Sequence, residues 1–393
     1  MSKRFIFTVL TIVVIGLISA FGVFLAKGYT FSTTSGRFVG TGIISITSQP
    51  DGASIYLDGH LTTATNANIS SLKPKTYDVK VVKDGFIPWE KQVEVKEGLV
   101  TDVKITLFPA IPTIYPLTFN GVANPVLSQD GSKLAFAVPI ATTSSTLARQ
   151  KGGIWVWSMV SQPISFNRSA EPHQIVASTQ DLDFTKATIR WSPDSKQILA
   201  TLQEGGNQSD SSTRNYLLNP DNLTQASDLR DITPTIASTL KAWDDDQKSK
   251  DAAAVLALKD SDVQKLASSS AILKWSPDAT MFIHRQQPLS LAEKKPEANL
   301  TGFKVYDTAV NKKYDLPEAK SYMWLPDSRH IILVQDGKIA ISEYDGTNVD
   351  VIFAGNFMNS FVFPWPDLSR LVIISFVPTP TASQPNLFGI NLK

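Results

Sequence analysis

The chain has 393 residues, and its 37 basic side chains nearly balance its 36 acidic ones, which leaves a formal net charge of +1. This balance gives no bulk electrostatic reason to expect a nucleic-acid partner. The absence of cysteine excludes disulfides, thiolate metal sites and thiol redox chemistry. The length is sufficient for two or three domains.

The N-terminus carries a long apolar stretch. Lys3 and Arg4 precede an uncharged segment that begins at Phe5 and ends at Ala26. About 20 helical residues cross the hydrocarbon core of a bilayer, whereas the apolar part of a cleaved signal peptide usually has about 7–15. The length therefore favours an uncleaved membrane anchor over a signal peptide. The positive-inside rule then predicts a cytoplasmic tip and transmembrane helix at residues 1–27, with the bulk of the chain extracytoplasmic.

Two regions of different composition follow the apolar stretch. Residues 28–40 are rich in glycine, serine and threonine, which predicts a flexible linker. Residues 41–109 contain short runs that alternate apolar with polar side chains and end at turn signals such as Asp58-Gly59. This pattern predicts a small all-β domain.

The motifs of this small domain are similar to those of a known family. Pro50-Asp51-Gly52-Ala53 with Tyr56-Leu57-Asp58-Gly59 resembles the PEGA domain, with Asp51 replacing the usual glutamate. Lys83-Asp84-Gly85-Phe86 and the following Trp89 match a second element of that family. The resemblance implies a small β-sandwich of the kind found in bacterial and archaeal surface proteins, without catalytic residues.

A short motif recurs through the rest of the chain. It is strongest as Trp-Ser-Pro-Asp, where proline pre-sets φ and aspartate can bond its own backbone, and an apolar run follows each copy. The first copy lacks tryptophan, and in the last Trp365 sits one position later. In chain order the copies cover residues 127–131, 191–194, 275–278, 324–327 and 364–367. Each copy is predicted to be a tight connection between two strands.

These copies resemble the WD40-like repeat of TolB-type β-propellers over residues 113–393. The resemblance implies a propeller of five blades. The fifth copy offers only three strands, and a strand near Ile114 could supply the missing outer one, since a propeller closes its ring to remove sheet edges. Six blades is the alternative if a long insertion hides another.

The insertion interrupts the repeats between about residues 205 and 270. Residues 205–213 are polar and predict a loop. Residues 234–270 carry apolar side chains at helical spacing and predict two or three short helices. Leu240, Trp243 and Leu256 are the candidate partner-binding residues of these helices. The alternative is a helical cap that packs on the propeller.

No catalytic constellation is present in the sequence. It lacks a Gly-x-Ser-x-Gly elbow, a phosphate-binding loop and a His-Glu-x-x-His motif. The four histidines are too dispersed to converge on one ion and are interpreted as surface residues. The aspartates at residues 244–246 lack the alternate spacing of a calcium loop. We therefore expect no catalytic residue, metal or cofactor.

Together these patterns predict a mainly β protein with an N-terminal transmembrane helix, a PEGA β-sandwich and a β-propeller with a helical insertion. The predicted function is non-catalytic: a membrane-anchored binding or scaffold protein of the cell envelope. Its membrane contact would be the segment from Phe5 to Ala26, and its partner an unknown envelope protein or a cell-wall glycan. The alternative is a propeller enzyme, a lyase or hydrolase, with an unrecognised active site.

Overall fold

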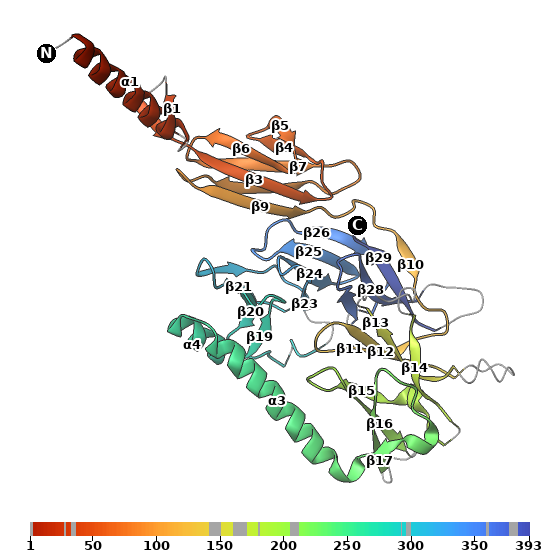
Figure 1. The fold of residues 1–393 in the computed structure, drawn as a ribbon. Helices are drawn as coiled ribbons and strands as arrows, with labels where there is room; N and C mark the ends of the chain where they lie inside the picture. The colour runs from red at the N-terminus through yellow and green to blue at the C-terminus, as the bar shows by residue number, and fades with distance from the viewer. Residues whose placement is uncertain are drawn as a thin grey trace. The chain divides into compact units, whose positions relative to one another are not determined.

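The computed structural model divides the chain into two compact units, residues 1–111 and residues 112–393. Each unit is described separately below (Figure 1). The structure describes residues 3–26, 29–32, 37–140, 151–159, 171–179, 181–204, 212–291, 293–295, 300–358, 361–376 and 384–393.

The first unit begins with helix α1 (Lys3–Ala26). Among the residues whose side chains the structure describes, no helix combines the length and the apolarity needed to cross a membrane. Strands β1 (Tyr29–Ser32) and β2 (Arg37–Gly40) then pair antiparallel. This hairpin lies where a flexible linker was predicted, because aromatic and β-branched side chains in both segments favour strand. The remaining linker residues, 28 and 33–36, lie outside the described residues.

The rest of the first unit is a sandwich of two sheets, as the PEGA resemblance implies. One sheet has the order β6-β3-β9, with β3 and β9 parallel, and the other has the order β5-β4-β7-β8. Ile44 and Ile46 of the first sheet pack with Val79, Val81 and Trp89 of the second. The strands are β3 (Gly42–Gln49), β4 (Ser54–Leu57), β5 (His60–Ala64), β6 (Ala67–Leu72), β7 (Thr76–Val82), β8 (Trp89–Glu94) and β9 (Val100–Thr106).

The described residues of the second unit form five four-stranded antiparallel sheets, which we call sheets I to V. Sheet I is β11 (Ala123–Leu127), β12 (Lys133–Val138), β13 (Gly153–Ser158) and β14 (His173–Ala177). Sheet II is β15 (Thr188–Trp191), β16 (Ile198–Glu204), β17 (Ser212–Leu218) and β18 (Arg230–Asp231). Sheet III is β19 (Ile272–Trp275), β20 (Met281–Arg285), β21 (Lys304–Asp307) and β22 (Lys312–Asp315). Sheet IV is β23 (Ser321–Trp324), β24 (His330–Gln335), β25 (Lys338–Glu343) and β26 (Asp350–Ala354).

Sheet V joins the two ends of the second unit. Its strands β27 (Val362–Pro364), β28 (Arg370–Ser375) and β29 (Asn386–Asn391) come from the end of the chain. Its fourth and outermost strand is β10 (Ile114–Pro116), which pairs antiparallel with β29 and lies beside it in Figure 1. The predicted origin of the missing outer strand is confirmed.

Each repeat copy connects the first two strands of one sheet, as predicted. In the second copy the Ser192 hydroxyl donates to the Asp194 carboxylate, and this hydrogen bond lowers the pKa of Asp194. The same carboxylate accepts from the Lys196 backbone N–H and so closes the turn. Ser195, the residue after the aspartate, has a positive φ of 58°. The residues of each copy therefore determine the backbone geometry of a turn, which explains why the same residue types recur.

Apolar clusters join sheet I to sheet II, sheet III to sheet IV, and sheet I to sheet V. One cluster contains Ile154 of sheet I and Ile189 of sheet II, and another contains Ile283 of sheet III and Ile331 of sheet IV. A third unites sheet I with sheet V, the first and last sheets in the sequence. The first and last sheets of the second unit are therefore packed against each other.

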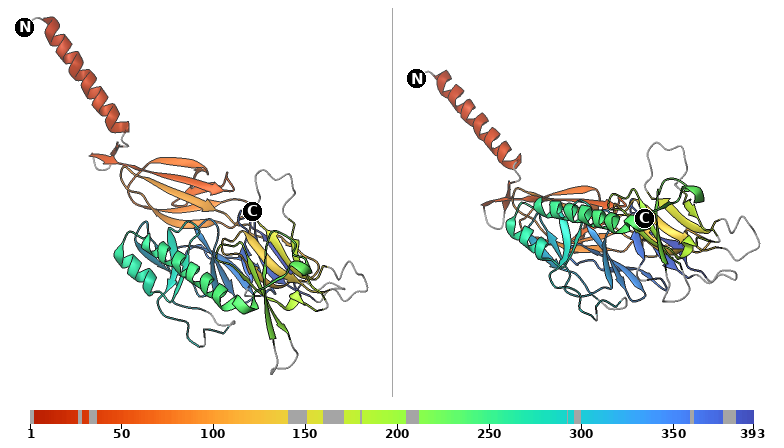
Figure 2. Two further views of the ribbon diagram at one scale, coloured as in Figure 1. Left: turned by 60° about the horizontal axis from the view of Figure 1, so that its bottom comes forward. Right: turned by 90° about the horizontal axis from the view of Figure 1, so that it is seen from below.

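The helical insertion contains one long and one short helix on the outside of the second unit (Figure 2). Helix α3 (Ile236–Leu256) has 21 residues and α4 (Ser261–Ser269) has nine. The prediction of two or three short helices was therefore wrong about length. Helix α3 continues through its aspartate run because lysines follow one turn later, as in the Lys250–Asp246 ion pair at 3.0 Å. Most of the loop predicted at residues 205–213 lies outside the described residues.

Candidate functional site

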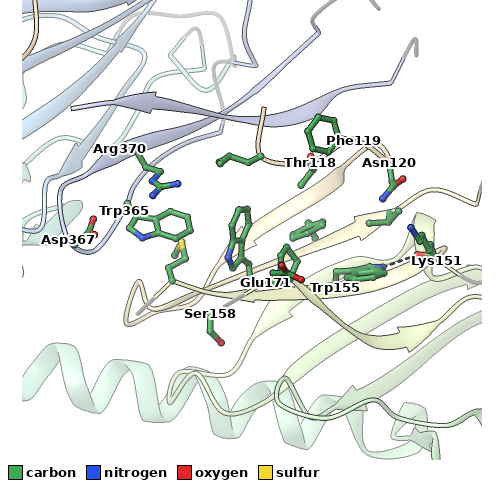
Figure 3. Close-up of a pocket in the computed structure, with 17 residues that line it drawn as sticks. Thr118, Phe119, Asn120, Lys151, Trp155, Ser158, Glu171, Trp365, Asp367 and Arg370 are labelled. Atoms are coloured by element: carbon green, nitrogen blue, oxygen red, sulfur yellow. Dashed lines mark hydrogen bonds between the residues drawn. The ribbon is translucent and has the colours of Figure 1, made fainter. Parts of the chain in front are cut away.

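A cavity of about 620 Å³ opens between sheets I and V, beside the loop that follows β10 (Figure 3). Its volume lies within the range of about 300–1,000 Å³ typical of small-molecule sites. Aromatic side chains form much of its wall: Phe119, Phe136, Trp155, Trp157 and Trp365. All of them belong to the second unit.

The alternation of β13 places two tryptophans in this cavity. Trp155 and Trp157 are two residues apart and therefore share one face of the strand. Ile154 and Val156 point to the opposite face, where they are buried between sheets I and II. Trp155 is fixed further because its indole N–H donates to the Lys151 carbonyl at 2.8 Å. One short strand thus supplies both a structural core and a wall of the cavity.

Sheet V contributes a third tryptophan because the last repeat copy departs from the pattern. Trp365 occupies the position that serine holds in the second and third copies. Its ring meets the edge of Trp157 with the centroids 5.2 Å apart. The Arg370 guanidinium lies 4.8 Å from the Trp365 centroid and 5.6 Å from that of Tyr115. The replacement of serine by Trp365 in the last copy therefore supplies the side chain that forms one end of the cavity.

Polar side chains surround the aromatic wall. Figure 3 shows Phe119 and Asn120 on one side of the cavity, across from Trp155, with Ser158 and Glu171 on the opposite side from Asn120. The charged side chains among the described lining residues are two basic and two acidic: Lys151, Arg370, Glu171 and Asp367. None of the described lining residues is a histidine. This arrangement can bind a ligand through ring faces and hydrogen bonds, and the four charged side chains together carry no net charge.

The predicted partner-binding residues do not form a common exposed surface. Trp243 is buried against Leu199 and Ile232, with Leu240 packed on the same cluster. Leu256 is 73% exposed. The packing of Trp243 and Leu240 corresponds to the alternative that we considered, a helical cap on the sheets.

Two histidines predicted to lie on the surface are buried. His330 is 5% exposed, and its Nδ1 lies 2.6 Å from an oxygen of Asp327. His284 is 4% exposed, and neither ring nitrogen has a hydrogen-bond partner among the described residues. The prediction failed because both histidines belong to central strands, β20 and β24, whose side chains are buried on both faces. In the described part of the chain, no group of three His, Cys, Asp or Glu side chains could hold a metal.

The burial of His284 predicts a pH dependence of stability. Burial, together with the positive charges of Lys313 and Lys304, lowers the pKa of His284 from 6.5 to about 4. Between these values the unfolded chain binds a proton that the folded chain does not. The free energy of unfolding should therefore fall as the pH drops from 6.5 to about 4, by on the order of 3 kcal/mol. Urea unfolding across this window should show the slope, and His284→Leu should reduce it; an equal slope in the variant would contradict the assignment.

Sequence reasoning assigned the tryptophans of the cavity only to strands and turns. A signal was nevertheless present, because Trp155 and Trp157 place two large aromatic rings on one face of a single strand. The displaced Trp365 was a second signal. Neither shows by itself that sheets I and V are neighbours.

Comparison with known proteins agrees with the small domain. Residues 41–111 match the PEGA domain family. No curated protein matches the chain. Among solved structures, a protein assigned as TolB from Agrobacterium tumefaciens is 14% identical, with 71% of this chain and 89% of that chain covered and a TM-score of 0.23. TolB from Acinetobacter baumannii is 13% identical, with 81% of this chain and 60% of that chain covered and the same TM-score of 0.23.

Proposed function

We propose that this chain is a membrane-anchored, non-catalytic binding protein of the cell envelope that takes its ligand in the cavity between sheets I and V. The observation that carries the proposal is the aromatic wall of that cavity with its rim of polar side chains. Such a combination is typical of binding sites, in which rings supply contact area and a few polar groups fix orientation. The proposal leaves the ligand open between an envelope protein and a cell-wall glycan.

In this proposal the second unit is a five-bladed β-propeller with sheets I to V as its blades. Two observations support this architecture. Strand β10 pairs with β29, so the last sheet takes its outermost strand from the beginning of the second unit, as ring closure requires. The first and last sheets also share an apolar cluster. The ligand cavity would then lie at the junction where the ring closes.

The membrane anchor in this proposal is the segment from Phe5 to Ala26, with the N-terminus cytoplasmic and the bulk extracytoplasmic. The charges of Lys3 and Arg4 support this orientation. The large apolar side chains between residues 7 and 23 of α1 are between 44% and 69% exposed, so the helix presents a large apolar surface. A lipid environment would cover them.

The absence of cysteine makes a single-thiol experiment possible. Phe119→Cys places one thiol at the cavity, since Phe119 is 75% exposed and lines it. On intact spheroplasts we expect a membrane-impermeant maleimide carrying a photo-crosslinker to label this thiol. Illumination should then join the cavity to an envelope component, either protein or glycan.

Leu291→Cys provides the matched control, because Leu291 is 85% exposed and is not among the residues that line the cavity. It should be labelled equally well and yield no adduct. Labelling that requires lysis would contradict the extracytoplasmic location. Labelling of both thiols without an adduct specific to Phe119→Cys would contradict the binding site.

A further inference from the structure

We propose that the cavity between sheets I and V binds a pyranose ring of a neutral oligosaccharide. This inference rests on the proposed function and names the ligand class of the same site. It follows from three features of the cavity: the exposed aromatic faces, the composition of the polar rim and the absence of a free strand edge in the wall.

The aromatic side chains form two opposed surfaces. Trp155 and Trp157 provide two indole rings from one strand. Phe119 lies across the cavity from Trp155 (Figure 3). Phe119 is 75% exposed, an unfavourable state for a large apolar ring. A pyranose presents an apolar C–H face that can pack against such rings, whose π faces are electron-rich. The aromatic lining thus suits a ligand that is apolar on its faces but polar around its edge.

The rim matches a ligand that both donates and accepts hydrogen bonds. The Asn120 amide can do both, whereas the Lys151 ammonium only donates and the Glu171 carboxylate only accepts. Hydroxyl groups around a sugar ring can satisfy all three. A purely apolar ligand would leave them without partners, which costs free energy on desolvation.

Charge further restricts the ligand to a neutral one. Glu171 and Asp367 would repel an anionic saccharide, and the Arg370 guanidinium is already held against the rings of Trp365 and Tyr115. A cationic ligand would meet Lys151. The balanced lining therefore gives neither sign of charge an advantage.

The wall also argues against an extended peptide. Peptides commonly add as a strand to an exposed sheet edge. The strands of this wall, β12 and β13, each have a paired neighbour on both sides. Recognition must therefore use side chains, as binding of a saccharide does.

The test uses the purified full chain in a detergent without a sugar headgroup. Maltotriose, cellotriose, chitotriose and mannotriose serve as neutral probes, a trimer of galacturonic acid as the acidic probe and an unrelated nonapeptide as the peptide probe. Binding is measured by tryptophan fluorescence and calorimetry. We expect at least one neutral trisaccharide to bind, with Phe119→Ala weakening it at least about tenfold, which corresponds to about 1.4 kcal/mol.

Leu291→Ala is the matched control, since it also removes an exposed apolar side chain and should leave affinity unchanged. Asn120→Ala gives a second exposed variant that should weaken binding without altering the core. The inference is overturned if no neutral probe binds, if only the acidic probe or the peptide binds, or if Phe119→Ala and Leu291→Ala behave alike. A protein adduct at Phe119→Cys in spheroplasts, with no saccharide bound in solution, would overturn this inference and leave the proposed function intact.

Discussion

Replacing Trp243 by alanine should lower the free energy of unfolding of the second unit by about 3–5 kcal/mol. The indole fills the contact between α3 and sheet II, where it packs on Leu199 and Ile232. Its ring also lies 5.9 Å from the Arg190 guanidinium, which pairs with Asp244 at 2.7 Å. Alanine would leave a cavity and remove this contact. Tryptophan emission can follow the urea transition, because seven of the eight tryptophans lie in the second unit and six remain in the variant.

Leu256→Ala is the control on the same helix. Leu256 is 73% exposed, so its loss should change the free energy of unfolding by no more than about 0.5 kcal/mol. Equal stability of the Trp243→Ala protein and the parent would show that α3 does not brace the sheets. That result would instead favour the predicted role of Leu240 and Trp243 in partner binding.

The helices matter because, among the described residues, sheets II and III lack two contacts that join sheet I to sheet II and sheet III to sheet IV. The Trp191 indole of sheet II donates to the Val126 carbonyl of sheet I, and Trp324 of sheet IV donates to Lys274 of sheet III. The equivalent Trp275 of sheet III has a buried indole N–H without a partner in the described part of the chain. Helix α3 packs on sheet II and α4 on sheet III at this junction. We infer that the two helices replace the missing contacts.

A second set of contacts shows the same interruption. The Ser195 hydroxyl accepts from the Asp130 backbone N–H, and the Ser328 hydroxyl accepts from the Asp278 backbone N–H. These bonds join sheet I to sheet II and sheet III to sheet IV. At the junction of sheets II and III the equivalent residue is Ala279, which has no hydroxyl. Sequence and structure therefore agree that this junction is built differently from its neighbours.

The strands could be predicted because their determinants are local. Turn residues and apolar runs located the first two strands of every sheet, and the odd number of strands in the last copy pointed to Ile114. The length of α3 was harder to predict. Three consecutive aspartates suggest the end of a helix, and the ion pairs that stabilise them in the helix are seen only in the structure. Burial of Trp243, His284 and His330 depends on which elements cover them. The local sequence carries little information about which elements pack together.

The cavity was not predicted because it depends on a long-range neighbour. Trp157 and Trp365 are more than 200 residues apart, yet their rings touch. Their contact follows from the pairing of β10 with β29, which brings sheet V beside sheet I. The repeat pattern suggested that the ring closes, but it gave no indication that aromatic side chains would gather at the junction.

Gly153→Ala should destabilise the second unit by roughly 2–4 kcal/mol, as overpacking and backbone strain act together. Gly153 begins β13 with φ of 142°, a conformation that other residues rarely adopt. An added Cβ would lie 2.1 Å from the Val176 carbonyl oxygen and 3.0 Å from the Ala177 Cα. Both atoms are backbone of the paired strand β14, so neither can move aside without breaking the pairing.

Gly131→Ala is the matched control for this substitution. Gly131 also has a positive φ, of 69°, but nothing lies within 4 Å of an added Cβ. The chain already carries alanine at the equivalent turn position, Ala279, with φ of 56°. We therefore expect a loss of only about 1 kcal/mol in the control. Because Gly153 lies two residues before Trp155, its substitution should also weaken ligand binding, whereas Gly131→Ala should not; equal unfolding curves for the two variants would contradict the close approach of β13 and β14.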